Sequence, residues 1–192
     1  NHAVGRFDRF SHGRKDHIAV WGDGNLGYIT SLFLRYRYPD AKLYIMGVNR
    51  DKLTGFSFAD ETFDVREIPD DIVIDHAFEC VGGTGAPKAI DQIIDHIRPE
   101  ATIGILGVSE NPVPVNTRMI LEKGLRVFGS SRSGRQDFIS TIEMFTEHPE
   151  MVALMKNIVG DVVDVRSIED MHTAFQKDIA KAGGKTIMLW NV

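Results

Sequence analysis

The chain has 192 residues, of which 43% are hydrophobic, and its 22 Lys and Arg against 27 Asp and Glu give a formal net charge of −5. This size and composition allow one domain with its own core, or one domain with an appendage. The acidic balance and the lack of a long basic run exclude nucleic acid from the expected partners, and no apolar run approaches the roughly 18 residues that a membrane helix needs.

Residues 1–16 predict a helix that precedes the main fold. Ala3, Phe7 and Phe10 lie at helical spacing, and the chain starts at Asn1 rather than at a methionine. We therefore expect the chain to be a piece of a longer protein, in which residues 1–16 link it to a preceding domain.

Strand and helix patterns alternate from His17 to about Gly129, which is typical of a parallel sheet covered on both faces. This alternation predicts an α/β fold with a doubly wound, six-stranded Rossmann sheet at residues 17–150. The segments that predict its strands are residues 18–21, 42–47, 63–66, 72–80, 102–106 and 125–129.

Helices are predicted between these strands and beyond them. The first ends by Tyr38, because Pro39 disfavours a helical residue before it, and another covers residues 86–97. The expected apolar stripe of the first helix is Leu26, Ile29, Phe33 and Tyr36. Beyond residue 133 the predicted segments are a helix at 136–147, a break at Pro149 and, within a C-terminal part at residues 151–192, a helix at 167–181 and a return strand at 186–190.

The turn after the first predicted strand carries three glycines in the spacing G-x-G-x-x-G. Gly22 permits a tight turn, Gly24 lets the backbone approach a pyrophosphate, and Gly27 allows the next helix to lie close to the strand. Unpaired N–H groups at the start of that helix favour a phosphate. Because the turn lies within a series of βα units, it indicates dinucleotide binding rather than an ordinary glycine-rich turn. The residues expected to contact the coenzyme there are Gly22, Asp23, Gly24, Asn25, Leu26 and Gly27.

The tip of the second strand decides which dinucleotide binds. An NAD site usually has Asp or Glu there, whereas this chain has Gly47, so a 2′-phosphate is not repelled. Arg50 and Lys52 follow closely enough to neutralise that phosphate, and together with Asn49 they favour NADP(H). The alternative is a merely solvated basic loop, and an inward turn of Asp51 would restore some NAD affinity.

Later strand ends supply further expected contacts, because ligands bind outside the carboxyl ends of such strands. The fourth strand end leaves room for the adenosine half of the coenzyme, and the fifth faces the nicotinamide. Cys80 is interpreted as a core residue without a catalytic role. The stretch GSSRSGR at residues 129–135 offers donors for a phosphate of coenzyme or substrate, or forms a polar surface loop. The expected contacts are Cys80, Val81 and Gly82, then Leu106, Gly107 and Val108, and last Ser130, Ser131 and Arg132.

Metal-ligand spacing is absent among the seven histidines and the one cysteine, so the histidines are expected to be structural or exposed. The single cysteine excludes an internal disulfide framework and fits a reducing compartment. We therefore expect a cytoplasmic protein.

The chain resembles a known family in five stretches, which are WGDGNLGYIT, DHAFECVGG, ILGVSENPVPVNTRMILEKGL, GSSRSG and GGKTIMLW. They are similar to the ribulose-5-phosphate reductases within the zinc-type medium-chain alcohol dehydrogenases, over nearly the whole chain. The first stretch is shared by many dehydrogenases, whereas NTR-x-x-LEKGL and GSSRSG are more specific.

The resemblance implies the C-terminal, coenzyme-binding half of a reductase. Such an enzyme transfers a hydride from NADPH to D-ribulose 5-phosphate and forms D-ribitol 5-phosphate for CDP-ribitol, a precursor of teichoic acid or capsule polymers. The family supplies its zinc ligands and proton relay mainly from a preceding domain, so no catalytic or metal-binding residue is carried over to this chain, which is expected to be inactive alone. A homodimer through the edge of the sixth strand and a cytidylyltransferase partner are also implied.

Two alternatives to this function are kept. In the first alternative, the chain is part of another NADP-dependent medium-chain polyol or alcohol dehydrogenase with a different substrate. In the second, it is a non-catalytic domain that senses a dinucleotide. A methyltransferase-like nucleotide domain is disfavoured by the three-glycine turn and by the basic loop.

Overall fold

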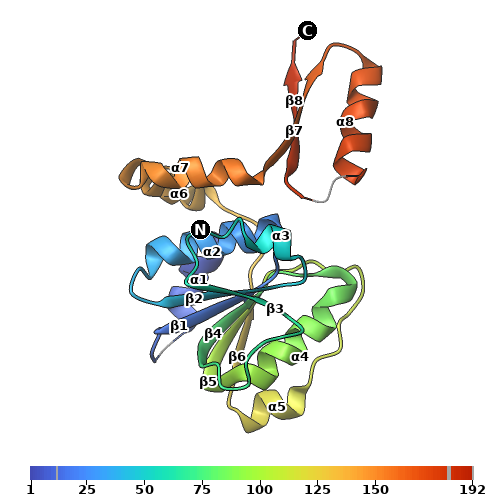
Figure 1. Ribbon diagram of the computed structural model, residues 1–192. Helices are drawn as coiled ribbons and strands as arrows, with labels where there is room; N and C mark the ends of the chain where they lie inside the picture. The colour runs from blue at the N-terminus through green and yellow to red at the C-terminus, as the bar shows by residue number, and fades with distance from the viewer. Residues whose placement is uncertain (12, 181–182, 192) are drawn as a thin grey trace. The chain divides into compact units, whose positions relative to one another are not determined.

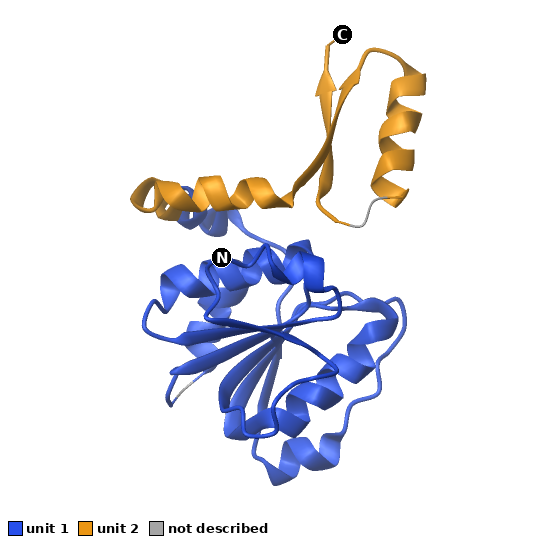
Figure 2. Ribbon diagram, viewed as in Figure 1, with its two compact units in different colours: residues 1–142 blue, residues 143–192 orange. Residues whose placement is uncertain are grey.

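The computed structural model describes residues 1–11, 13–180 and 183–191. The chain divides into two compact units, residues 1–142 and residues 143–192 (Figure 2). His12 and the predicted helix end at Lys181 lie outside the described residues.

Unit 1 is built on a six-stranded parallel sheet with the strand order β3-β2-β1-β4-β5-β6. The order reverses between β1 and β4, which confirms the predicted doubly wound topology. The strands are β1 (His17–Trp21), β2 (Lys42–Gly47), β3 (Glu61–Asp64), β4 (Ile74–Glu79), β5 (Ile97–Ile105) and β6 (Arg126–Gly129).

Helices cover both faces of this sheet, with α1 and α2 on one side and α4 and α5 on the other (Figure 1). The sheet therefore lies at the centre of a three-layered unit, as expected for buried parallel strands. The helices of unit 1 are α1 (His2–Phe10), α2 (Asn25–Arg37), α3 (Arg50–Leu53), α4 (Ala86–His96) and α5 (Thr117–Glu122), with a short 3₁₀ turn, η1 (Gly83–Gly85). A further helix, α6 (Arg135–Glu147), includes the boundary between the two units.

The predicted apolar stripe of α2 is only partly correct. Phe33 is buried, but Leu26 is 41% exposed because it lies in the first turn, at the open edge of the sheet. Tyr28, Leu32 and Leu34 are buried instead. They are covered because α2 packs against β1 and β2 and also against α1, so that most of its middle turns are enclosed.

Several strand boundaries differ from the sequence prediction, and β3 and β5 are two examples. β3 begins at Glu61, before the predicted segment, although Phe63 and Val65 pack inward as expected. β5 begins at Ile97 and includes Pro99, close to the point where the register with β4 shifts between Ile74 and His76. Such an irregularity tolerates proline, which cannot donate a ladder hydrogen bond.

Unit 2 is a small βαβ arrangement with its own parallel two-stranded sheet. The sequence predicted its second strand, the return strand at residues 186–190, but not its first strand at residues 159–165. Pro149 does end one helix, and it also starts the next, because proline is favourable in the first turn. The elements are α7 (Pro149–Met155), η2 (Lys156–Ile158), β7 (Val159–Val165), α8 (Ile168–Ala180) and β8 (Lys185–Trp190).

Phe7 is the main contact between α1 and the rest of unit 1. It is fully buried, and its ring meets those of Tyr38, His76 and Phe78 edge to face, with centroids 5.7, 5.0 and 5.1 Å away. Phe10, on the same helix, is 44% exposed and stacks on Phe128. Residues 1–10 are therefore part of the packed unit.

Phe7→Ala is expected to lower the free energy of unfolding by about 3–5 kcal/mol, because it leaves a cavity among three rings. Phe10→Ala removes the same side chain from a half-open position and is expected to cost about 1 kcal/mol. Urea unfolding followed by circular dichroism measures both values. Equal losses from the two variants would contradict this packing.

Candidate functional site

The candidate site lies at the carboxyl edge of the six-stranded sheet. All six strands are parallel, so the loops after β1, β2, β4, β5 and β6 open at the same edge. The sequence-predicted site residues lie in these loops or at the start of the following helix, except Gly47, which is the last residue of β2. The fold brings them to one side, next to the point between β1 and β4 where a ligand is expected.

The glycine turn after β1 is closed at both ends and open in the middle. A Cβ on Gly27 would lie 1.9 Å from the Gly22 carbonyl oxygen. The first turn of α2 can therefore lie this close to the strand end only with glycine at position 27. Gly22 has φ +131° and a Cβ there would lie 2.8 Å from the Cys80 carbonyl oxygen. A Cβ on Gly24 would meet nothing within 4 Å.

The first turn of α2 offers backbone donors at this opening. Gly24 is the N-cap and has no side chain to cap the helix. No described residue accepts a hydrogen bond from the N–H groups of Asn25, Leu26 and Gly27, and the first bond of the helix runs from the Tyr28 N–H to the Gly24 carbonyl. These donors and the helix dipole together form an anion-binding position.

The tip of β2 is shaped by a carboxylate from the glycine turn. Asp23 Oδ2 accepts hydrogen bonds from the N–H groups of Val48 and Asn49, at 2.8 and 2.7 Å. Asn49 then caps α3 by accepting from the Lys52 N–H at 3.1 Å. The loop that was predicted to hold the basic residues is therefore a short, capped helix.

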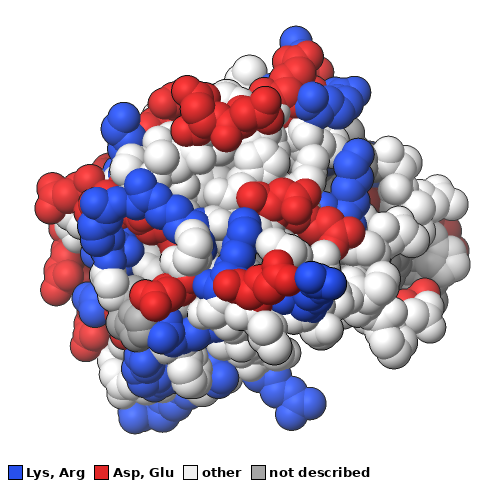
Figure 3. All heavy atoms as spheres, turned by 90° about the horizontal axis from the view of Figure 1, so that it is seen from below, with Lys and Arg blue, Asp and Glu red and all other residues white. Residues whose placement is uncertain are grey.

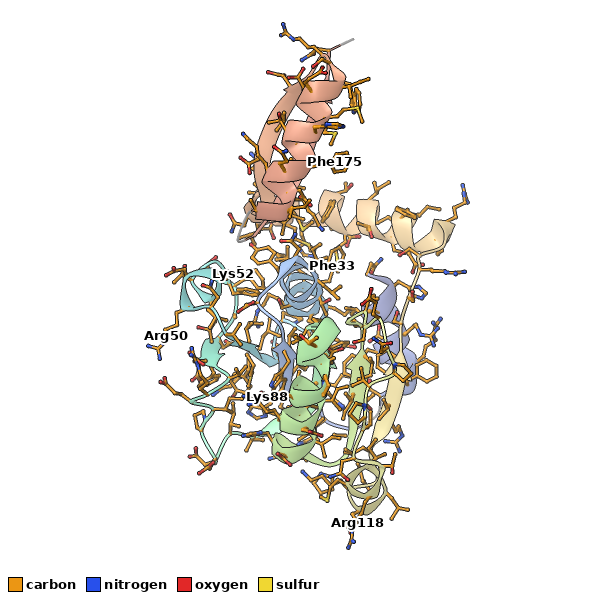
Figure 4. The ribbon with its side chains drawn as sticks, turned by 90° about the vertical axis from the view of Figure 1, so that its right-hand side faces the viewer. Phe33, Arg50, Lys52, Lys88, Arg118 and Phe175 are labelled. Atoms are coloured by element: carbon orange, nitrogen blue, oxygen red, sulfur yellow. The ribbon has the colours of Figure 1, made fainter. Side chains whose placement is uncertain are left out.

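The basic residues beyond β2 lie in an ion-pair cluster. Arg50 projects outward (Figure 4) and donates to both carboxylate oxygens of Glu67 at 2.9 Å. Arg66, two residues beyond the end of β3, pairs with Asp64 and lies 3.5 Å from the Val48 carbonyl oxygen. The Arg66 guanidinium holds the pKa of the Asp64 carboxyl well below its usual range.

Arg66 is a site candidate that sequence reasoning missed. It was included in the third predicted strand without a role, because its closeness to the β2 tip depends on the pairing of β2 with β3. The signal available in the sequence was a basic residue at the end of a strand next to the predicted phosphate loop. Lys52, the other predicted cation, lies on α3 with its side chain partly buried, and Figure 4 shows it near Arg50.

Glu79 connects the loops after β4 and β5. Its side chain is fully buried, and Oε1 accepts from the N–H groups of Val81 and Gly82 at 2.8 and 2.7 Å. Oε2 accepts from the Gly107 N–H at 3.1 Å. Three charge-assisted hydrogen bonds thus offset the burial of this carboxylate and fix both loops.

The same two loops approach each other too closely for larger residues. A Cβ on Gly107 would lie 2.3 Å from the Gly82 nitrogen, and one on Gly82 would lie 2.6 Å from the Val108 carbonyl oxygen. Leu106 is buried beneath the loops, whereas Val81 and Val108 are 45% and 85% exposed at the edge. Both exposed valines offer apolar contact to a ligand at this edge.

Cys80 has the buried position that was predicted for it. Burial raises the pKa of its thiol to about 12, and the Thr30 side chain forms a hydrogen bond with it. A thiol that stays protonated at neutral pH is a poor nucleophile. Its side chain packs beneath the glycine turn, so any ligand contact from this residue comes from its backbone.

The loop after β6 carries the predicted hydroxyl and guanidinium donors. Ser130 is half-buried, Ser131 and Arg132 are exposed, and Arg132 has φ +64°, a conformation uncommon outside glycine. Asp137 holds the end of this loop by accepting from the Gly134 N–H at 2.7 Å, a bond that lowers the pKa of its carboxyl. His2 of α1 contacts the same carboxylate at 2.9 Å.

An apolar cavity of about 190 Å³ lies on the α4 side of the sheet. Glu79 and Ser109 are the polar residues that line it, among aliphatic side chains of α4, β5 and the following loop.

On the face shown in Figure 3, Lys and Arg side chains are interspersed with Asp and Glu rather than forming one basic patch.

The described residues do not fit a zinc site. No group of three or more His, Cys, Asp or Glu among them is placed to hold a metal ion. Cys80 is buried and is not part of any such group among the described residues. In the part of the chain that the structure describes, no helix is both long enough and apolar enough to span a membrane.

Residues 41–147 match the family described as zinc-binding dehydrogenase, and the chain belongs to this family. It is 49% identical over 191 residues to a ribulose-5-phosphate reductase of Bacillus spizizenii and 48% identical to ribulose-5-phosphate reductase 2 of Staphylococcus aureus. The alignments cover the whole chain but 56% of each relative. These relatives confirm the resemblance seen in the five sequence stretches.

Solved structures agree with this placement. The crystal structure of S. aureus TarJ in complex with NADPH superposes with a TM-score of 0.95 at 46% identity, and covers 100% of this chain and 60% of that one. The glucose dehydrogenase of Haloferax mediterranei has a TM-score of 0.74 at 21% identity and shows the shared fold alone.

Gly27→Ala is expected to lower the free energy of unfolding by about 3 kcal/mol or more, because its methyl group would overlap a backbone oxygen that cannot move freely. Gly24→Ala adds the same methyl group in open space, at a negative φ, and is expected to change stability by less than about 0.5 kcal/mol. Thermal and urea unfolding measure both effects. A Gly27→Ala variant as stable as Gly24→Ala would contradict the close approach of α2 to the turn.

Proposed function

We propose that this chain is the NADP(H)-binding part of a reductase that converts D-ribulose 5-phosphate to D-ribitol 5-phosphate for CDP-ribitol synthesis. The observation that carries the proposal is the open, uncapped start of α2 at Gly24, at the carboxyl edge of a doubly wound sheet. The reductase assignment is supported by relatives that are 43–49% identical and are named ribulose-5-phosphate reductase.

The residues of the turn fit a dinucleotide. The N–H groups of Asn25 and Leu26 would hydrogen-bond the pyrophosphate, and the bare backbone of Gly24 would let it approach. On the adenosine side, Arg50 and Arg66 would bind the 2′-phosphate, because each keeps guanidinium N–H groups beyond those used in its ion pairs. Lys52 would add charge from the same short helix.

The loops after β4 and β5 would hold the rest of the coenzyme. The Glu79 bonds hold the backbone at Val81 and Gly107, so that the Val81 and Val108 side chains would shield the nicotinamide half from water. When bound, NADPH supplies the hydride for carbonyl reduction. The chain would bind NADPH and orient its nicotinamide ring toward the sugar carbonyl. This orientation matters because the rate of hydride transfer depends on how the two reacting groups are positioned.

The metal chemistry of the family lies outside what these residues support. Zinc does not fit the described residues, so the ligands and the proton relay are proposed to come from a preceding domain. The chain spans about 56% of the curated relatives. We propose that the chain alone binds coenzyme but does not reduce the sugar.

We further propose a cytoplasmic homodimer that pairs across β6. In this sheet β6 is an edge strand, and an edge position favours pairing with a second copy. Arg132 in the loop after β6 would bind a phosphate of substrate or coenzyme. A cytidylyltransferase that consumes the ribitol phosphate is the proposed partner.

The 192-residue chain is expected to bind NADPH more tightly than NADH by at least tenfold, because two guanidinium groups near the β2 tip favour the 2′-phosphate. Isothermal titration calorimetry measures both constants. The longer protein is expected to oxidise NADPH in the presence of D-ribulose 5-phosphate, followed at 340 nm, and not in the presence of unphosphorylated D-ribulose. Tighter NADH binding would refute the coenzyme assignment, and equal rates with both sugars would refute the substrate assignment.

A further inference from the structure

We propose that Asp23 sets the coenzyme selectivity of this site, by holding a carboxylate at the place where position 47 lacks one. This inference rests on the proposed coenzyme function. In it, Asp23 accepts a hydrogen bond from the adenosine ribose, which both coenzymes carry, and at the same time opposes the 2′-phosphate that only NADP(H) carries.

The geometry comes from the space beside Gly47. A Cβ on Gly47 would lie 2.7 Å from the Asp23 Cβ and 2.8 Å from Asp23 Oδ2, so the Asp23 side chain fills the volume that a side chain at position 47 would enter. NAD sites usually place their acid at this strand tip. The chain therefore has a carboxylate near the tip of β2, and it belongs to Asp23 in the glycine turn.

Two hydrogen bonds fix the orientation of this carboxylate. Oδ2 accepts from the Val48 and Asn49 N–H groups, and no described residue donates to Oδ1. Asp23 is half-buried and lies between Gly22 and Gly24, so it joins the proposed pyrophosphate position to the β2 tip. The adenosine ribose of a bound dinucleotide must cross the same interval, where Oδ1 is a free acceptor.

The charge of Asp23 is not compensated by the neighbouring arginines. Arg50 pairs with Asp64 and Glu67, and Arg66 pairs with Asp64, and neither contacts Asp23 among the described ion pairs. A 2′-phosphate at the β2 tip would therefore interact with two partly neutralised cations and one full negative charge. The preference for NADP(H) is the difference between these two opposing effects.

The expectation that a 2′-phosphate meets no carboxylate at the tip of β2 is revised by this contact. Gly47 does remove the acid from position 47, but the same small residue is what allows Asp23 to approach. The two positions are complementary: a carboxylate at position 23 requires the smallest residue at position 47.

Asp23→Asn tests the proposal with little change of shape. The Asn side-chain oxygen can accept the same two N–H bonds, while its amide group replaces Oδ1 and the charge is lost. We expect the Kd of NADPH to fall about fivefold, because a repulsion disappears, and the Kd of NADH to rise about fivefold, because a ribose acceptor is lost. Coenzyme fluorescence titration of the 192-residue chain measures both constants.

Asp51→Asn is the matched control, since it removes the same charge from an exposed position on α3. It is expected to change the ratio of the two Kd values by less than about twofold. The proposal fails if Asp23→Asn changes both Kd values by the same factor, or if Asp51→Asn shifts their ratio as much as Asp23→Asn does. If the unsubstituted chain binds neither coenzyme, the proposed function fails, and this inference fails with it.

A second comparison covers the case in which Asp23→Asn does not fold. Asp23→Gly combined with Gly47→Asp moves the acid to the tip of β2. Removal of the Asp23 side chain leaves only the flexible end of Leu53 close to the new side chain at position 47. We expect this double variant to keep the original NADPH to NADH ratio to within about threefold. Asp23→Gly alone is expected to shift the ratio toward NADPH, and an unchanged ratio in that single variant would overturn the proposal.

Discussion

The close approach of α2 to the turn after β1 is the constraint on which the candidate site depends. The Gly22 carbonyl oxygen occupies the space of a Cβ on Gly27, so the helix begins against the strand end with its first N–H groups directed to the open edge. Any larger residue would displace the helix start and, with it, the donors that define the anion position. The remaining loops add to a site that this contact creates.

Carboxylates hold the loops around that position. Asp23 fixes the β2 tip, Glu79 fixes the loops after β4 and β5, and Asp137 fixes the loop after β6, each through backbone N–H groups. Such bonds orient a loop without occupying the cations nearby, because the donors are main-chain groups. The edge is thus organised before any ligand arrives, which lowers the entropic cost of binding.

The sequence predicts the local features of this arrangement and misses those that depend on distant residues. The bounds of β2 and the end of α2 follow from apolar patterning and from Pro39. The Asp23 contact with Asn49 joins residues 26 positions apart, and the role of Arg66 depends on which strand lies next to β2. Neither pairing leaves a local pattern. Leu26 was assigned inward because helical spacing does not reveal which end of a helix faces an open edge.

A crystal structure of the chain with NADPH tests the central claim most directly. The account predicts the pyrophosphate oxygens within hydrogen-bond distance of the N–H groups in the first turn of α2, against the bare backbone of Gly24. A coenzyme bound elsewhere, with side chains filling the turn, would contradict it.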